Sequence, residues 1–175
     1  MRRRRSRKWG SKSKTTAKRS ACKITPTGQA NIDIQNRLQV RHFLDILVAE
    51  AMCGKGNAID AGVTRRRLDY WAIAISWRNP AYIGYEVKCT RADFLADQKT
   101  QFYEKQCTQF IWVTAKGVVN DISEIPEQHG WQELSDTGKT LITRKKAPML
   151  EPCNVQLFNA IKSALMRHLK PWAPI

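Results

Sequence analysis

Two apolar segments separated by a short polar loop constrain the fold of this chain most strongly. RRRLDYWAIAI (residues 65–75) and YIGYEVKC (residues 82–89) are rich in aromatic and apolar residues, and SWRNPA (residues 76–81) places an Asn-Pro break between them. This pattern predicts two buried strands joined as an antiparallel hairpin.

Helical and strand patterns flank the hairpin on both sides. Apolar residues recur at helical spacing in residues 31–52 and 155–169, and Thr90 is a good N-cap for a helix from about Arg91 to about Gln106. Further strands are expected within residues 109–115, 125–134 and 139–148. The order predicts one domain of the mixed α/β or α+β class with a central sheet. The apolar contacts of the two later helices are expected from Phe94, Leu95, Phe102 and Tyr103, and from Leu157, Ile161, Leu165 and Leu169.

Basic residues are concentrated at the N-terminus. Residues 1–23 hold eleven of the 30 lysines and arginines and no acid, which leaves 19 basic and 15 acidic residues in the rest of the chain. We therefore predict a disordered basic arm, residues 1–24, before a domain at residues 25–175. The arm is typical of nucleic-acid binding, and a solubilising or targeting tail is the alternative. The expected nucleic-acid-binding residues of the arm are Arg2, Arg3, Arg4, Arg5, Arg7 and Lys8.

The composition argues against a membrane or secreted protein. No apolar stretch approaches the roughly 18 residues that a transmembrane helix requires, and no apolar segment follows the charged N-terminus as in a signal peptide. The five cysteines are scattered without a C-x-x-C pair, which favours reduced thiols and no disulfide-linked partner. We expect a cytoplasmic protein of a bacterial or phage-type setting, whose oligomeric state the sequence does not specify.

Glu86 and Lys88 stand two residues apart in the second strand. Residues i and i+2 share a face of a strand, so these side chains project together, roughly 7 Å apart along the chain. Tyr85 and Val87 would point into the core and anchor the strand. The hydrophobic setting makes this acid–base pair a candidate site, although an exposed ion pair on a wet sheet face is the alternative.

Asp69, on the preceding strand, is expected to join the pair. If residues 76–79 form the loop, Ile75 faces Pro80, and the same register places Asp69 opposite Glu86. Two carboxylates so close repel each other unless a cation lies between them. Carboxylate oxygens suit Mg²⁺ or Mn²⁺, so a divalent cation is expected here.

These residues resemble a known group of enzymes. Asp69 followed by Glu86-Val87-Lys88 resembles the PD-(D/E)-x-K nuclease superfamily, with Leu68 where the superfamily name has proline. The longer pattern is similar to the MmcB-like DNA-repair family, over about residues 69–148. It comprises Arg67-Leu68-Asp69, Glu86-Val87-Lys88, Thr90-Arg91-Ala92-Asp93-Phe94, Asp97, Lys99, Tyr103, Pro126 and Gly130.

The resemblance implies a restriction-endonuclease-like fold, in which helices flank a central mixed sheet and the active site lies where the two central strands separate. It also implies a Mg²⁺-dependent deoxyribonuclease of DNA repair or processing. Asp69 and Glu86 would bind one or two Mg²⁺, for which Mn²⁺ substitutes, with the Val87 carbonyl as a further ligand. Lys88 would orient or help deprotonate the attacking water and offset charge in the transition state. Glu50, near the end of the first expected helix, is a candidate outer metal ligand.

Other residues are expected to support the site or to hold the substrate. Thr90, Arg91, Asp93, Asp97 and Lys99 match the family pattern and are interpreted as supporting residues, with Asp97 and Lys99 shaping the site or pairing with Arg91. Arg65, Arg66 and Arg67 would clamp phosphates of DNA, with RNA as the alternative polymer. Two other functions remain open: a DNA-binding module of the same fold without activity, and an RNA-binding structural protein.

Overall fold

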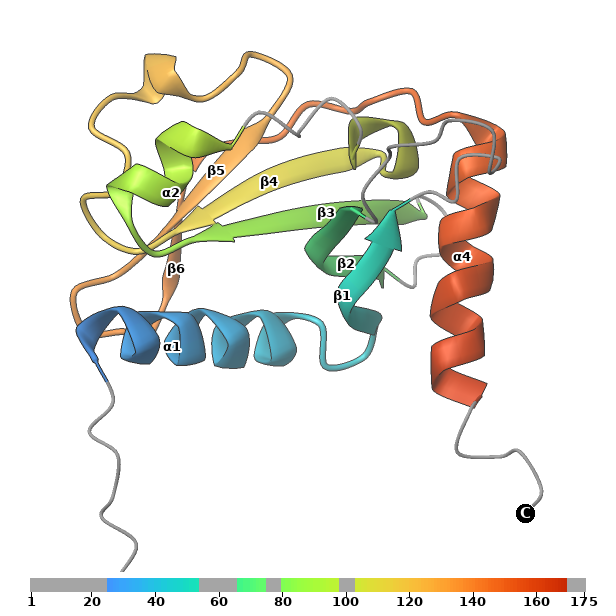
Figure 1. Ribbon diagram of the computed structural model, residues 1–175, viewed down its shortest axis with the longest axis horizontal. Coiled ribbons are helices and arrows are strands. Elements are labelled where there is room, and N and C mark those ends of the chain that lie inside the picture. The colour runs from blue at the N-terminus through green and yellow to red at the C-terminus, as the bar shows by residue number, and fades with distance from the viewer. Residues whose placement is uncertain (1–24, 54–65, 75–79, 98–102, 170–175) are drawn as a thin grey trace, which may run out of the picture.

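The strands of the protein form one six-stranded mixed sheet in chain order (Figure 1). The structure is a computed structural model that describes residues 25–53, 66–74, 80–97 and 103–169. Pairing is parallel between β3 and β4 and between β4 and β5, and antiparallel between the other neighbours. The predicted mixed α/β class is confirmed, while the basic arm lies outside the described residues. The strands are β1 (Ile46–Cys53), β2 (Arg66–Ala74), β3 (Ala81–Lys88), β4 (Gln109–Thr114), β5 (Gly130–Leu134) and β6 (Leu141–Lys145).

Helices cover both faces of the sheet. Helix α1 (Pro26–Arg41) packs on one face, where Ile34 and Leu38 are buried against Tyr85. Helices α2 (Arg91–Ala96) and α4 (Asn154–Leu169) contribute to the apolar cluster on the other face, which is built around Trp71 and Trp112. Two short 3₁₀ segments, η1 (Glu104–Gln106) and η2 (Ile122–Glu124), lie in the connections. Within the described residues, no helix is both long and apolar enough to cross a membrane.

The first expected helix is wrong in its second half. Helix α1 begins after Thr25, whose hydroxyl accepts a hydrogen bond from the Gly28 N–H, and it ends at Arg41. Residues 46–53 form strand β1 instead, which pairs with β2 from Ile46 opposite Ile73 onward. Pairing with β2 bonds one edge of this segment and Val48 is buried, so tertiary contacts override the helical spacing.

The expected helix after Thr90 is also shorter than predicted. Helix α2 ends at Ala96, because the chain turns to an extended conformation at Asp97. Phe94 and Tyr103 are buried as predicted, whereas the prediction for Leu95 is wrong, since it is 61% exposed. In α4, Leu157 and Ile161 pack on the core as predicted and Leu165 does not. Phe102 and the side chain of Leu169 lie outside the described part of the chain.

Candidate functional site

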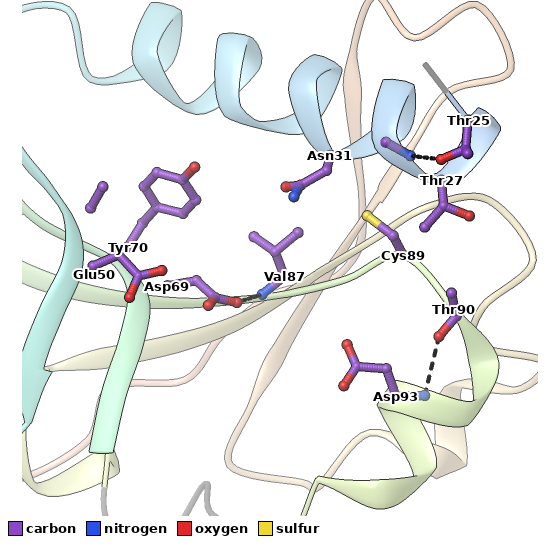
Figure 2. A pocket seen from close by; sticks show the side chains of 12 residues that line it. Thr25, Thr27, Asn31, Glu50, Asp69, Tyr70, Val87, Cys89, Thr90 and Asp93 are labelled. Atoms are coloured by element: carbon purple, nitrogen blue, oxygen red, sulfur yellow. Dashed lines mark hydrogen bonds between the residues drawn. The ribbon is translucent and has the colours of Figure 1, made fainter. Parts of the chain in front are cut away.

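The pairing of β2 and β3 ends at the predicted acidic residues. The register runs from Ala74 opposite Ala81 to Tyr70 opposite Tyr85, so its continuation places Asp69 opposite Glu86, as predicted. Beyond Tyr70, a side chain replaces the backbone ladder. The Val87 N–H donates a hydrogen bond of 2.7 Å to the Asp69 carboxylate (Figure 2). The two central strands therefore separate where the candidate site begins.

Lys88 lies at the centre of a buried ionic cluster at the end of β3. Its Nζ lies 2.7 Å from Asp97 Oδ2, 3.1 Å from Glu86 Oε1 and 3.7 Å from Asp93 Oδ1. The side chains of Lys88, Glu86 and Asp97 are only 6–8% exposed. Glu86 and Lys88 thus share a face as predicted, but they are covered rather than held out to solvent.

Helix α2 explains why this ionic cluster is covered. The Thr90 hydroxyl accepts a hydrogen bond of 3.2 Å from the Asp93 N–H, which starts the helix directly after β3. Phe94 then packs edge-on against Trp112, with ring centroids 5.2 Å apart. This contact holds the helix on the sheet, and the early end of the helix places Asp97 against Lys88. The expected N-cap role of Thr90 is confirmed.

The Glu86 carboxyl is poorly compensated for its burial. Desolvation and the nearby charge of Asp69 raise the pKa of Glu86, which lies at about 8 instead of its usual 4.5. Lys88 opposes this rise through its charge and its hydrogen bond, but it offsets only part of it. The ammonium is shared with Asp97 and Asp93, so the site is short of positive charge.

The pKa values of Asp69 and Lys88 are also shifted by burial and by the neighbouring charges. Burial raises the pKa of Asp69, while the hydrogen bond from Val87 and the charge of Lys88 act in the opposite direction. Burial alone would lower the pKa of Lys88. The hydrogen bond to Asp97 and the charge of Glu86 outweigh it, so the pKa lies above its usual value. Lys88 is therefore a permanent cation among carboxylates.

One oxygen of Glu86 has no partner in the described structure. Glu86 Oε1 accepts from Lys88, whereas Oε2 is buried without a hydrogen bond. An unpaired buried carboxylate oxygen is costly, and a cation between Glu86 and Asp69 would remove both this cost and the repulsion between the two acids. The donor set consists of hard oxygens, so these residues fit Mg²⁺ or Mn²⁺.

The Val87 carbonyl lies on the side of β3 that such a cation requires. The neighbouring Lys88 carbonyl accepts from the Ala115 N–H beyond β4. Successive residues of a strand direct their backbone groups to opposite edges, so Val87 directs its N–H and its carbonyl toward β2. The N–H reaches Asp69, which places the predicted carbonyl ligand beside the same carboxylate.

Protein side chains alone do not complete a metal centre here. Across the described ranges, no three His, Cys, Asp or Glu side chains are grouped so that they could hold an ion. A cation on Asp69 and Glu86 would need a carbonyl and water ligands as well. Mg²⁺ is suited to that arrangement because it commonly keeps several of its waters.

Glu50 is level with Asp69, but on a strand and not on a helix as expected. Its neighbours Ala49 and Ala51 pair with Tyr70 and Leu68, so Glu50 continues the row of acids onto β1. Its backbone has φ of 52°, an uncommon conformation for a residue with a side chain. Its carboxylate lies 3.2 Å from Arg67 Nη1 and is 60% exposed. Glu50 therefore borders the site and belongs to an ion pair at its rim.

A cavity of about 520 Å³ adjoins this row of acids (Figure 2). It lies between the first turns of α1, the middle of β2 and the C-terminal end of β3. Asp69 forms part of its wall, together with Tyr70 from β2 and Asn31 from α1. Figure 2 shows these side chains directed into the same space, with Asp93 of α2 on the opposite side. The candidate site thus has an adjoining space for a ligand.

Of the remaining predicted site residues, some make contacts away from the acids and others lie outside the described part of the chain. Arg91 binds Glu124 through two hydrogen bonds and donates to the Val118 carbonyl. Of the two alternatives for Asp97, the structure shows contact with Lys88 at the site and not pairing with Arg91. Arg67 is exposed at the rim beside Glu50. The residues without a described side chain are Lys99, Arg65, Arg66, Arg2, Arg3, Arg4, Arg5, Arg7 and Lys8.

Two features of the site were missed in the sequence. The contact of Asp97 with Lys88 depends on where α2 ends, which no capping residue signals. The wall contributed by α1 could have been recognised, because Thr25-Pro26-Thr27 combines an N-cap with proline at the first helical position. That signal would have placed Asn31 in the second turn of a helix rather than at its start.

Comparisons with known proteins define the fold and nothing further. No family model matches the chain, and no curated protein matches it. A solved structure, the SPO1766 protein of unknown function from Silicibacter pomeroyi, is similar with a TM-score of 0.60 and 17% sequence identity. The match covers 86% of this chain and 91% of that one. The chain therefore has a fold that a bacterial protein shares across most of its length.

Proposed function

We propose that this protein is a metal-dependent nuclease that hydrolyses phosphodiester bonds in DNA during repair or processing. The observation that carries the proposal is the buried, unpaired Oε2 of Glu86, opposite Asp69 and two residues from a buried lysine. In a purely structural salt bridge, both oxygens of the buried Glu86 carboxylate would have hydrogen-bond partners. In a cation site, one carboxylate oxygen is left free to bind the metal. The resemblance of Asp69 and Glu86-Val87-Lys88 to the nuclease motif supports the same function.

In this proposal, Asp69, Glu86 and the Val87 carbonyl hold Mg²⁺ or Mn²⁺. The bound cation would polarise a phosphate oxygen and lower the pKa of the attacking water. The hydrogen bond from the Val87 N–H fixes one oxygen of Asp69 and leaves the other for the metal. Burial in the sheet fixes Glu86 in the same way, since only 8% of its side chain is exposed.

Lys88 supplies a fixed positive charge in this proposal. Asp97 and Glu86 bind its ammonium from two directions, which restrains a side chain that is otherwise flexible. A restrained cation stabilises the negative charge that develops on the phosphoryl oxygens in the transition state. The cation does not have to reorganise during the reaction. Asp97 is therefore assigned a positioning role, because it acts through Lys88.

The basic arm would supply most of the affinity for DNA. Its residues Arg2, Arg3, Arg4, Arg5, Arg7 and Lys8 contact phosphates without regard to sequence in this proposal. The described domain carries its own cation at the site rim, Arg67. The arm joins the domain at Thr25, which lines the cavity beside Asp69. DNA held by the arm would thus lie near the acids.

Cleavage of labelled DNA tests the proposal. Purified full-length protein is incubated with single-stranded, duplex, flap and junction DNA, and with RNA, in Mg²⁺, Mn²⁺ or EDTA. We expect Mg²⁺- and Mn²⁺-dependent cleavage of DNA that Glu86→Gln abolishes. Glu127→Gln is the matched control, because Glu127 is an exposed acid in the loop before β5. DNA binding without cleavage in either metal would assign the protein to the non-catalytic alternative.

A further inference from the structure

The cavity beside Asp69 has the size and the lining of a ligand site. Its volume of about 520 Å³ falls within the range of pockets that hold small molecules, roughly 300–1,000 Å³. Tyr70 offers a half-buried aromatic ring, Asn31 an amide and Thr27 a hydroxyl. Figure 2 shows the ring and the amide on the side of the cavity nearest α1.

Without a bound cation, the charges of the lining do not favour a phosphate group as the occupant. None of the described residues that line the cavity is a lysine or an arginine, and three of them are acids. Two of these acids already have a cation nearby: Glu50 pairs with Arg67, and Asp93 lies 3.7 Å from Lys88 Nζ. A neutral ligand with hydrogen-bond donors therefore suits this space better than an anion or a strong cation.

We infer that the cavity accepts an unstacked nucleobase of the substrate strand. An aromatic ring provides a stacking surface, and amide, hydroxyl and carboxylate groups recognise the polar edges of a base. Asp69 belongs both to the cavity wall and to the proposed cation site, so a base in the cavity brings the adjoining phosphate to the acids. The inference rests on the proposed function and defines its substrate as single-stranded DNA, or as duplex with an unpaired nucleotide.

Fluorescence of a base analogue tests this inference. Full-length protein in EDTA is titrated with a short oligonucleotide that contains 2-aminopurine, as a single strand and as a matched duplex. Salt is held at about 0.2 M so that the contribution of the arm is reduced. We expect tighter binding of the single strand and a change in 2-aminopurine emission on binding.

Two variants fill or strip the cavity without touching the proposed metal ligands. Asn31→Trp fills the space from an exposed position of α1, and Tyr70→Leu removes the stacking ring. Loss of one stacked base predicts roughly 5- to 100-fold weaker single-strand binding. Asn36→Trp is the matched control, because Asn36 is an exposed asparagine on the same helix and outside the cavity lining. It should leave binding unchanged.

The outcomes separate this inference from the proposed function. Equal affinity for single strand and duplex, with no effect of Asn31→Trp, would overturn the base site. If cleavage in Mg²⁺ persists under that result, the nuclease proposal survives without it. If both cavity variants weaken single-strand binding and no metal supports cleavage, the base site stands and the nuclease proposal fails.

Discussion

Replacing Glu86 by glutamine should stabilise the metal-free protein. The carboxylate is buried with one oxygen unpaired, and its pKa is raised from 4.5 to about 8. The folded state therefore holds a proton at Glu86 that the unfolded chain releases, so wild-type stability falls as the pH rises through that window. Glutamine does not titrate. The stability of the variant relative to wild type should thus increase from about pH 5 to about pH 8.

The size of the effect follows from the same shift. Each pKa unit corresponds to about 1.4 kcal/mol, so the charge of Glu86 costs roughly 4 kcal/mol by about pH 8. The variant also loses the ion pair of Glu86 with Lys88, and this loss reduces the stabilisation. We expect a net increase of about 1–3 kcal/mol in the free energy of unfolding at about pH 8 in EDTA.

Urea unfolding followed by tryptophan fluorescence measures this difference, and Glu133→Gln provides the contrast. Glu133 is equally buried, but its oxygens accept hydrogen bonds from the Gly117 N–H and from Arg144. Removing that satisfied charge should destabilise the protein by about 1–3 kcal/mol. Adding Mg²⁺ should stabilise wild type and leave Glu86→Gln unchanged. A Glu86→Gln protein that is several kcal/mol less stable than wild type in EDTA would refute the argument.

Three further results are expected. Lys88→Ala should lower turnover of DNA by roughly 10²-fold with little change in affinity, and Asp97→Asn should lower it less; an effect confined to affinity would assign Lys88 to phosphate binding. Deleting residues 1–23 should flatten the slope of log affinity against log salt by roughly 3–4 units if about four cations engage, with turnover at saturating DNA retained; an unchanged slope would exclude the arm from binding. Burial lowers the pKa of His129, so stability should fall as the pH drops below about 6.5, and His129→Gln should weaken this dependence; an identical pH profile would contradict it.

The centre of the sheet could be predicted because its determinants are local. The length of the loop between the two apolar segments fixes the register, and Ala74 indeed pairs with Ala81. Alternation along β3 then places Tyr85 in the core and Glu86 with Lys88 on the opposite face. Both inferences need only the spacing of residues within one hairpin.

The C-terminal ends of α1 and α2 could not be predicted because they depend on distant contacts. Residues 46–53 have helical spacing, but the edge of β2 offers them a ladder of backbone pairs that is interrupted at Glu50. His42, which caps α1, is fixed by Asp45 at 2.8 Å and by the Tyr85 hydroxyl at 2.8 Å. The partner on β3 is 43 residues away, and no local pattern reveals it.

The burial of the ionic cluster has the same origin. Glu86 and Lys88 were expected to be held out from the sheet, because a strand pattern specifies the face and not what covers it. Helix α2 covers them through Phe94 and places Asp97 against Lys88. The grouping of three carboxylates around the Lys88 ammonium therefore depends on tertiary packing and could not be predicted from the strand pattern.

The central claim is that Asp69 and Glu86 together hold a divalent cation. Anomalous diffraction from crystals of the full-length protein grown with Mn²⁺ locates the ion directly. We expect one ion bound by a carboxylate oxygen of each residue and by the Val87 carbonyl, with metal–oxygen distances of about 2.0–2.2 Å. The ion should be absent from Glu86→Gln crystals. Manganese absent from wild-type crystals, or bound at Glu50 or Asp93 without Glu86, would contradict the account.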